Sequence, residues 1–416
     1  MLLACTASMS DPDQMSLKLQ LIPIALVAMV LSVVGVCGYY GWSSYRRSDL
    51  KARSRAAALG RRWTELESLA EQWSAWEPRN GEAWMLRANG ASGQEDWQSA
   101  AKHLSSIPDG DPRIIPAMIE LSKLSFTQLN DPLQGVAACE RILRNDPAAD
   151  GARQQLIWFY AMTLQREQLL NHIRTAIELG SEPRESYVYY FLVDTFRSAE
   201  AVKLNQKWLE SAPQAEVFQV ARIMHMSDRE SGLSDSPDAA TAVETPGALK
   251  GQSKLELVAE LLKRYPHNVE LLAYKAEDCL KAGDVECAST LLSQAPVGAR
   301  QDSRFWRIRG WLHELDDKLE LAADDYHQAL KLHPVDWNTM NRLVIVERRR
   351  QNISEVERLN KLVEKAQSLR QFLQKLPAVE VVPPPALLEL SKLARDCNDR
   401  LIEPGLVRRL ASAGMR

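Results

Sequence analysis

The side chains that most often carry enzyme chemistry show no catalytic spacing in this sequence. The seven histidines form no HExxH motif and no Cys/His cluster with the spacing of a zinc site. The chain also lacks a glycine-rich phosphate loop, a G-x-G-x-x-G motif and a G-x-S-x-G motif. The acidic pairs Asp316–Asp317 and Asp324–Asp325 fall in a predicted turn and on a predicted outward helix face, where carboxylates are ordinarily solvated. We therefore predict no enzymatic activity, no cofactor, no metal and no small-molecule substrate.

Apolar and small residues in the stretch Ser303–Asp336 predict the element around which the chain is organised. Trp306, Gly310 and His313 fall at i, i+4 and i+7, and Ala322, Tyr326 and Ala329 repeat that spacing, so each set lies on one face of a short helix. The small residues allow the two helices to approach closely, while the aromatic residues fill the gaps between them. The residues predicted to pack this helix pair are Trp306, Gly310, Ala322, Tyr326, Ala329 and Pro334, the last of which ends the second helix.

This stretch resembles a tetratricopeptide repeat (TPR), whose pattern is W-x2-L-G-x2-Y, then A-x3-F, then P, within a repeat of about 34 residues. Arg309 stands where Leu is usual, and His313 stands where Tyr is usual. A step of one repeat length towards the N-terminus reaches only apolar residues, among them Ala276 and Ala288. An equal step towards the C-terminus gives a weaker copy with one polar position, Asn360. We therefore predict three repeat units in one register, at 269–302, 303–336 and 337–370.

The resemblance implies an all-α fold, a right-handed α-solenoid in which the first helices of successive repeats line a concave groove. Guanidinium and amide groups in such a groove can hold a peptide carboxylate or an acidic side chain, and a tryptophan can supply an apolar anchor. The candidate groove residues are Arg304, Arg307, Trp311, Asn338, Asn341 and Arg342. The alternative is that the arginines form a solvated face and Trp311 packs locally.

The N-terminal region contains a long uncharged stretch. Residues 1–18 form a short polar tail, and residues 19–45 contain no Asp, Glu, Lys or Arg. A helix needs about 20 apolar residues to cross the hydrocarbon core of a bilayer, so this stretch is long enough. Tyr39, Tyr40 and Trp42 cluster at its far end, as in an interfacial aromatic belt. We predict a single transmembrane helix at 19–45 that contacts the lipid bilayer; a cleaved signal peptide, whose apolar run is usually shorter, is the alternative.

Basic residues mark one side of this predicted span. Lys18 is the basic residue that precedes it, whereas Arg46 and Arg47 follow it closely together with further Lys and Arg residues. The positive-inside rule therefore predicts a single-pass protein of the cell membrane with a cytoplasmic soluble part. The cysteines show neither CxxC spacing nor a dense framework, which also favours a reducing compartment. A periplasmic or extracellular soluble part is the alternative, since a long domain can be translocated despite its flanking charge.

The rest of the chain divides by composition and by proline positions. Residues 46–227 carry divergent TPR-like repeats, in which Trp84 and Ala88 reproduce the marker spacing. Residues 228–250 are rich in Ser, Asp, Pro, Gly and Ala and predict a flexible insertion, either merely tolerated or used for docking. Residues 251–370 contain the clearest repeats, and residues 371–416 supply a linker and capping helices.

These observations favour a non-catalytic function. The composition is that of folded protein, with 45% hydrophobic and 25% charged residues, and the formal net charge of −3 gives no reason to expect nucleic acid. We expect a membrane-anchored TPR scaffold or adaptor that binds a protein or peptide partner in its groove. An assembly or chaperone factor for envelope components, and a regulatory subunit of a membrane enzyme complex, are the alternatives.

Overall fold

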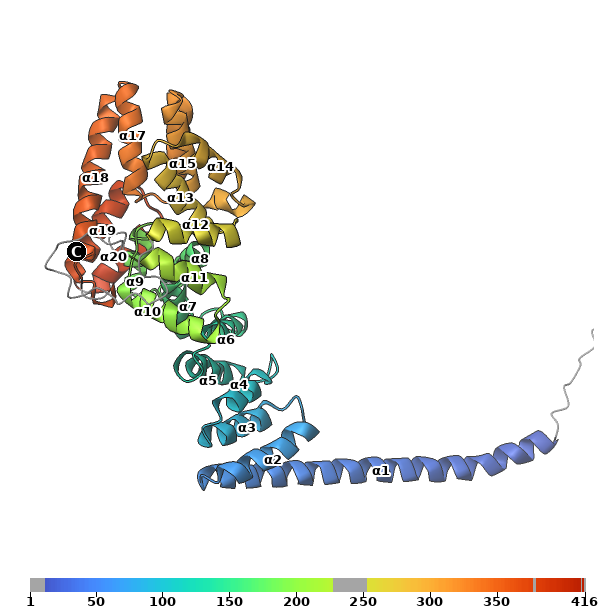
Figure 1. The fold of residues 1–416 in the computed structure, drawn as a ribbon. Coiled ribbons are helices and arrows are strands. Elements are labelled where there is room, and N and C mark those ends of the chain that lie inside the picture. Colours follow the sequence, from blue (N-terminus) through green and yellow to red (C-terminus); the bar gives the residue numbers. More distant parts are fainter. Residues whose placement is uncertain (1–11, 227–252, 377–378, 413, 415–416) are drawn as a thin grey trace, which may run out of the picture. The chain divides into compact units, whose positions relative to one another are not determined.

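The computed structural model describes residues 12–226, 253–376, 379–412 and residue 414 (Figure 1). Every regular element in these ranges is helical, which confirms the predicted all-α class. The chain divides into two compact units, Met1–Leu121 and Ser122–Arg416. The insertion predicted at 228–250 lies outside the described residues.

The first unit consists of helices that pack on their neighbours in sequence. Its core is formed where the end of α1 meets α2 and α3, around residues such as Leu50, Leu66 and Trp73. The side chains of Asn80 and Asp96 cap α3 and α4 by accepting hydrogen bonds from backbone N–H groups of the first turn. The helices that begin in this unit are α1 (Pro12–Leu59), α2 (Trp63–Trp76), α3 (Gly81–Gly93), α4 (Trp97–Ser105) and α5 (Ile114–Thr127), the last of which ends in the second unit.

Helix α1 contains the whole of the predicted span at 19–45 and continues beyond it. Near its C-terminal end, Leu50, Ser54 and Ala57 are buried, whereas Tyr40 and Trp42 are exposed. Among the residues that the structure describes, no helix is both long and apolar enough to pass through a bilayer. Part of the predicted span, the side chains of residues 19–28, 30 and 31, lies outside that description.

The second unit contains the remaining helices. Its first half comprises α6 (Pro132–Asn145), α7 (Asp150–Met162), α8 (Arg166–Leu179), α9 (Glu185–Phe191), α10 (Ala199–Ser211), α11 (Glu216–His225) and α12 (Lys254–Arg264). Its second half comprises α13 (Val269–Lys281), α14 (Val285–Ser293), η3 (Val297–Gln301), α15 (Ser303–Leu315), α16 (Leu319–Leu332), α17 (Trp337–Arg349), α18 (Ile353–Leu373), η4 (Val379–Val381), α19 (Pro384–Asp396) and α20 (Ile402–Ser412).

The predicted repeat period is visible in the positions of these helices. Helices α13, α15 and α17 begin at Val269, Ser303 and Trp337, so successive starts are separated by one repeat length. Helices α14, α16 and α18 follow the same interval, and each pairs with the helix before it. The residue just before each first helix is a capping residue, whose side chain accepts a hydrogen bond from a backbone N–H group of the first turn. These residues are Asn268, Asp302 and Asp336. The capping residues therefore begin every first helix of the three repeats.

Two of the predicted packing residues, Gly310 and Tyr326, meet at the contact between paired helices. A Cβ atom at Gly310 would come within 2.7 Å of the Cε1 atom of Tyr326, so the absence of a side chain there lets α15 and α16 touch. Tyr326 is fully buried and donates a hydrogen bond to Glu314. Ala276, Ala288, Ala322, Ala329 and Ala88 are also buried, whereas Trp306, Pro334 and Trp84 are half-buried.

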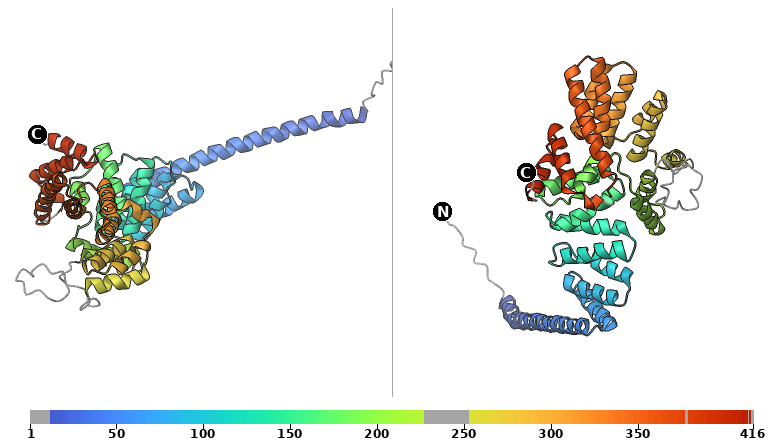
Figure 2. Two further views of the ribbon diagram at one scale, coloured as in Figure 1. Left: turned by 90° about the horizontal axis from the view of Figure 1, so that it is seen from above. Right: turned by 90° about the vertical axis from the view of Figure 1, so that its left-hand side faces the viewer.

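The C-terminal helices do more than cover the end of the last repeat. Helix α19 packs on α18, but α20 packs on α8, far earlier in the sequence (Figure 2). The hydroxyl of Tyr190, in α9, donates a hydrogen bond of 2.7 Å to Asp399. A Cβ atom at Gly405 would lie 2.4 Å from the hydroxyl of Tyr187, so α20 sits closely against this region. The expected capping helices thus also contact α8 and α9, which lie in the first half of the second unit.

Candidate functional site

A network of buried ion pairs joins distant parts of the second unit. It contains three arginines and five carboxylates, and we call it the buried ion-pair network. Its members come from α8, the connection after α9, α13, and the starts of α15 and α17. They are Arg166, Asp194, Glu270, Glu277, Asp302, Arg304, Arg307 and Asp336.

Arg304 is clamped between two carboxylates. Its two terminal nitrogens each donate a hydrogen bond of 2.6 Å to one oxygen of Glu270, which is the bidentate geometry that suits a guanidinium. Its Nε atom lies 3.0 Å from Asp302 Oδ1. Burial opposes the charge, but Asp302 and Glu270 outweigh it and raise the pKa of Arg304. This arginine therefore ties the start of α15 to α13.

Arg307 lies one helical turn further along and holds three carboxylates from three segments. Its Nη1 atom donates to Asp194 at 3.0 Å and to Asp336 at 2.5 Å, and its Nη2 atom donates to Glu277. Only 6% of the residue is exposed. Burial again opposes the charge, yet Asp336 and Glu277 raise the pKa of Arg307 above its ordinary value. Arg307 is the residue that links α13, α15 and α17 to the connection after α9.

Arg166 completes the network from α8. It pairs with Asp194, lies 3.6 Å from Asp302, and donates a 2.8 Å hydrogen bond to the hydroxyl of Ser303. Burial lowers the pKa of Arg166, while the charge of Asp302 counteracts that effect. Arg166 and Ser303 are 137 positions apart in the sequence. The network therefore fixes α8 against the three C-terminal repeats.

Two aspartates of the network form, together with the buried His333, a group that could hold a metal ion, but both aspartates already pair with an arginine. Potential ligand atoms of Asp194, His333 and Asp336 lie within 4.8 Å of one another. The Nη1 atom of Arg307, however, donates to both of these aspartates. A metal cation bound by the same oxygens would face the positive guanidinium at close range, which is unfavourable in a buried site. The geometry thus pairs these carboxylates with Arg307.

Two of the predicted groove arginines must be reassigned. Arg304 and Arg307 are buried, and their guanidinium groups pair with carboxylates of the network, so they form no open surface for a peptide. A sequence pattern places them on one helix face but does not show that carboxylates from other segments cover that face. The expectation that Arg304 and Arg307 lie on an open surface, whether solvated or ligand-binding, is therefore wrong.

The other predicted groove residues remain near the surface. Trp311 is half-buried, and the guanidinium of Arg342 stacks over its ring at 3.4 Å from the centroid. Arg342 also lies 3.8 Å from Glu314. Asn338 is half-buried and Asn341 is exposed. This part of the predicted set forms a local cation–π pair beside two amides.

A buried carboxylate accounts for the two departures from the TPR pattern. Asp325, expected on a solvated face, is only 4% exposed, which corrects that expectation. It accepts hydrogen bonds from Arg309 and from the Nδ1 atom of His313, at 2.9 Å for His313. The polar residues at these two marker positions therefore satisfy Asp325 rather than filling an apolar core.

A cleft of about 650 Å³ opens beside the network, and we call it the α8–α13 cleft. Arg166, Glu270 and Asp302 lie at its base, where they belong to the buried ion-pair network. Its other lining residues are mostly polar and come from the start of α8 and from the segments that flank α13 and η3. They include Gln165, Gln168, Asn171, Arg174, His267, Asn268 and Gln301.

The sequence pattern predicts neither the burial of Arg304 and Arg307 nor the α8–α13 cleft, for an identifiable reason. The lining of this cleft combines α8 with α13 and η3, which are far apart in the chain. A repeat pattern relates only neighbouring units. One signal in the sequence could have indicated the buried ion pairs. Asp302 and Asp336 occupy the N-cap position of successive repeats, and Arg304 next to the first of them adds a charge that capping does not need.

Comparisons with known proteins do not indicate a function for this chain. The sequence matches no protein-family model and no curated protein. The chain is similar to the solved structure of a tetratricopeptide repeat protein from Parabacteroides merdae, at 13% identity and a TM-score of 0.25, over 73% of this chain and 99% of that one. It is also similar to yeast Tom70, at 13% identity and a TM-score of 0.28, over 91% of each chain. At such TM-scores neither structure carries weight for the fold or function of this chain.

The network predicts an unequal cost for two arginine substitutions. Arg307→Met leaves three carboxylates without their shared partner, and we expect it to lower the free energy of unfolding by about 3–5 kcal/mol. Arg342→Met removes a partly exposed cation–π pair, and we expect a loss of about 1 kcal/mol or less. Urea denaturation followed by circular dichroism measures both. Equal losses for the two variants would contradict the structural role given to Arg307.

The burial of His333 leads us to predict that the free energy of unfolding falls as the pH is lowered. Burial and the nearby Arg166 lower the pKa of His333 to about 4, whereas an unfolded chain has a histidine pKa of about 6.5. The unfolded state therefore binds a proton first, so this contribution is complete above about pH 6.5 and is lost as the pH falls towards 4, by roughly 3 kcal/mol.

The buried His225, whose pKa is lowered to about 3 chiefly by burial, adds a loss in the same range. We therefore expect His333→Gln to flatten, but not abolish, the decline in unfolding free energy between pH 6.5 and pH 4. Urea titrations at a series of pH values measure the slope. A slope identical to that of the wild type would show that His333 is not the group responsible.

Proposed function

We propose that this protein is a membrane-anchored scaffold that binds an extended segment of a partner protein in the α8–α13 cleft, without catalysing a reaction. The observation that carries the proposal is a cleft of about 650 Å³ whose base is held by buried ion pairs. Clefts of roughly 300–1,000 Å³ are typical of ligand sites. A base fixed by several segments also reduces the ordering that a partner must impose on binding.

The lining of the cleft supports a polypeptide as its occupant. Gln168 and Asn171 lie on α8, and Gln301 lies across from them in η3; all three side chains are exposed. An amide side chain both donates and accepts hydrogen bonds, so it can pair with the backbone of an extended peptide whatever its sequence. The charged groups at the base are paired with one another. The lining also contains Glu167, Glu216 and Arg174, so it carries both signs of charge rather than the single sign that would favour a strongly charged small molecule.

The N-terminal stretch supports contact with a bilayer. Residues 19–45 carry no charge, and a helix of that length extends roughly 40 Å, more than the roughly 30 Å of a hydrocarbon core. Tyr39, Tyr40 and Trp42 are exposed on α1. Arg46 stacks over Trp42 at 5.2 Å and over Trp76 at 5.4 Å, an arrangement suited to the interface between lipid and water.

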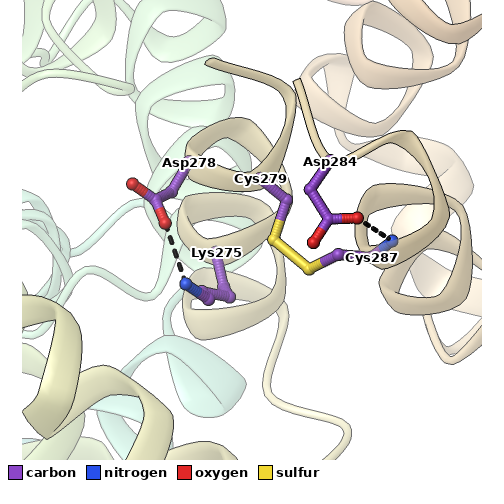
Figure 3. The surroundings of a disulfide bond; sticks show 5 residues. All are labelled: Lys275, Asp278, Cys279, Asp284 and Cys287. Carbon is purple, nitrogen blue, oxygen red and sulfur yellow. Dashed lines mark hydrogen bonds and ion pairs between the residues drawn. A yellow bond between two sulfur atoms is a disulfide. The ribbon is translucent and has the colours of Figure 1, made fainter. Parts of the chain in front are cut away.

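A disulfide favours one of the alternative functions, that of an assembly or chaperone factor outside the cytoplasm. Cys279 of α13 and Cys287 of α14 are joined across the helix pair, with Cα atoms 6.0 Å apart (Figure 3). Disulfides persist mainly in oxidising compartments, so this bond favours a periplasmic or extracellular soluble part over the cytoplasmic one expected from flanking arginines. Long domains are translocated despite such flanking charge. The cysteine spacing predicts no such bond, because Cys279 and Cys287 are eight positions apart and meet only across the turn between the two helices.

Binding in the cleft is tested by a photo-crosslinking amino acid placed at Gln168 or at Gln301 in cells. We expect both positions to yield an adduct with the same protein segment, and a matched position at the exposed Lys361 of α18 to yield none. The crosslinked segment, made as a synthetic peptide, should bind the full-length protein, and at least about tenfold more weakly to a Gln301→Trp variant that fills the cleft. Adducts that are the same at all three positions would contradict the proposal.

The side of the membrane is tested by trapping thiols in cells with acid and labelling them with a maleimide polymer. If the soluble part lies in an oxidising compartment, Cys279 and Cys287 resist labelling until a reductant is added. A Cys279→Ser variant should then expose Cys287 to the label without reductant. Labelling of both thiols in the untreated wild type would instead favour a cytoplasmic scaffold.

A further inference from the structure

A second cleft, separate from the one described above, lies between α10, α11 and α12. It has a volume of about 580 Å³, and we call it the α10–α12 cleft. Its apolar part is formed by Leu209, Ile223, Leu257 and Leu261. Its charged part contains three cations and one carboxylate, namely Arg222, Lys263, Arg264 and Glu260.

Arg222 is a half-buried guanidinium without a carboxylate. Its Nη1 atom donates to the side-chain oxygen of Gln206, a neutral group. Its Nε atom is buried and has no hydrogen-bond partner among the described residues. Burial lowers the pKa of Arg222. Partial burial of the positively charged Arg222 is therefore unfavourable, and no carboxylate among the described residues offsets it.

The other two cations of the cleft, Lys263 and Arg264, also lack a carboxylate partner. Arg264 donates to the side-chain oxygen of Gln219 at 3.2 Å and to that of Gln214, both neutral amides. Lys263 is exposed. Among the described residues, none of these three cations forms an ion pair with a carboxylate. The arginines of the buried ion-pair network differ sharply, since each of them contacts at least two carboxylates.

We propose that the α10–α12 cleft binds an acidic peptide segment of a partner protein through its carboxylate side chains. A guanidinium pairs with a carboxylate through two parallel hydrogen bonds, and Arg222 and Arg264 both have donors to offer. The half-buried Leu209 and Leu261 beside them accept the apolar residues of the same peptide, whereas Ile223 and Leu257 are buried in the core behind this lining. Glu260 opposes the ligand, so its charge sets a limit on the affinity.

Fluorescence anisotropy with the full-length protein in a mild detergent tests this inference. The probe is a blocked, labelled six-residue peptide of alternating glutamate and leucine, and its control has glutamine in place of glutamate. We expect the acidic peptide to bind at low salt, more weakly as salt rises, and at least about tenfold more tightly than the control. Inorganic phosphate at matched ionic strength should compete poorly.

Four variants make the result specific. Arg264→Gln changes an exposed residue and should weaken binding about tenfold, and Arg222→Gln should weaken it as much or more. Glu260→Gln removes the opposing charge and should strengthen binding about twofold to threefold. Arg348→Gln removes the same charge from an exposed position of α17 and should leave binding unchanged. Circular dichroism checks the fold of each, and Arg264→Gln decides the matter if Arg222→Gln unfolds.

Four outcomes would overturn the inference. Three of them are the absence of binding at low salt, equal binding of the acidic peptide and its glutamine control, and equal weakening by Arg264→Gln and Arg348→Gln. Displacement of the peptide by inorganic phosphate at equal concentration would also overturn it, because the site would then recognise a simple anion. None of these outcomes depends on the α8–α13 cleft.

Discussion

The guanidinium of Arg307 is the contact on which the second unit depends. It is buried, and its three carboxylate partners come from α13, the start of α17 and the connection after α9. A buried charge without partners costs several kcal/mol, so an arrangement that separated Arg307 from these carboxylates would be disfavoured. Apolar packing alone fixes no such arrangement, because it has no direction. The ion pairs therefore specify which segments come together, whereas burial of apolar groups supplies most of the stability.

Two kinds of packing are superimposed in this unit. The first is the repeat of helix pairs, in which small residues such as Gly310 bring paired helices into contact and each pair covers its neighbours. The second crosses the repeat, because Arg166 of α8 and the C-terminal helix α20 contact segments more than a hundred residues away. The α8–α13 cleft exists because of the second kind, since its two walls come from segments far apart in the chain that are held together by ion pairs.

The sequence predicts what repeats locally and misses what is distant. The period, the small packing residues and the all-helical class follow from patterns within one repeat length, and the helix starts at Val269, Ser303 and Trp337 keep that interval. The partner of Arg307 at Asp194 is 113 positions away, so no local pattern indicates whether this arginine faces solvent or a carboxylate. The same limit explains why a groove was expected on Arg304 and Arg307. The cysteine pair is close in sequence, but its contact depends on the turn between α13 and α14.

Hydrogen exchange of the native protein tests the central claim most directly. If the buried ion-pair network makes α8, α13, α15 and the start of α17 one cooperative element, slowly exchanging amides in all four segments should open with one common free energy. That free energy should fall together in all four when urea is added. Exchange in α8 at a clearly lower free energy than in α15 would contradict the account, because the two segments would then open independently despite the ion pairs between them.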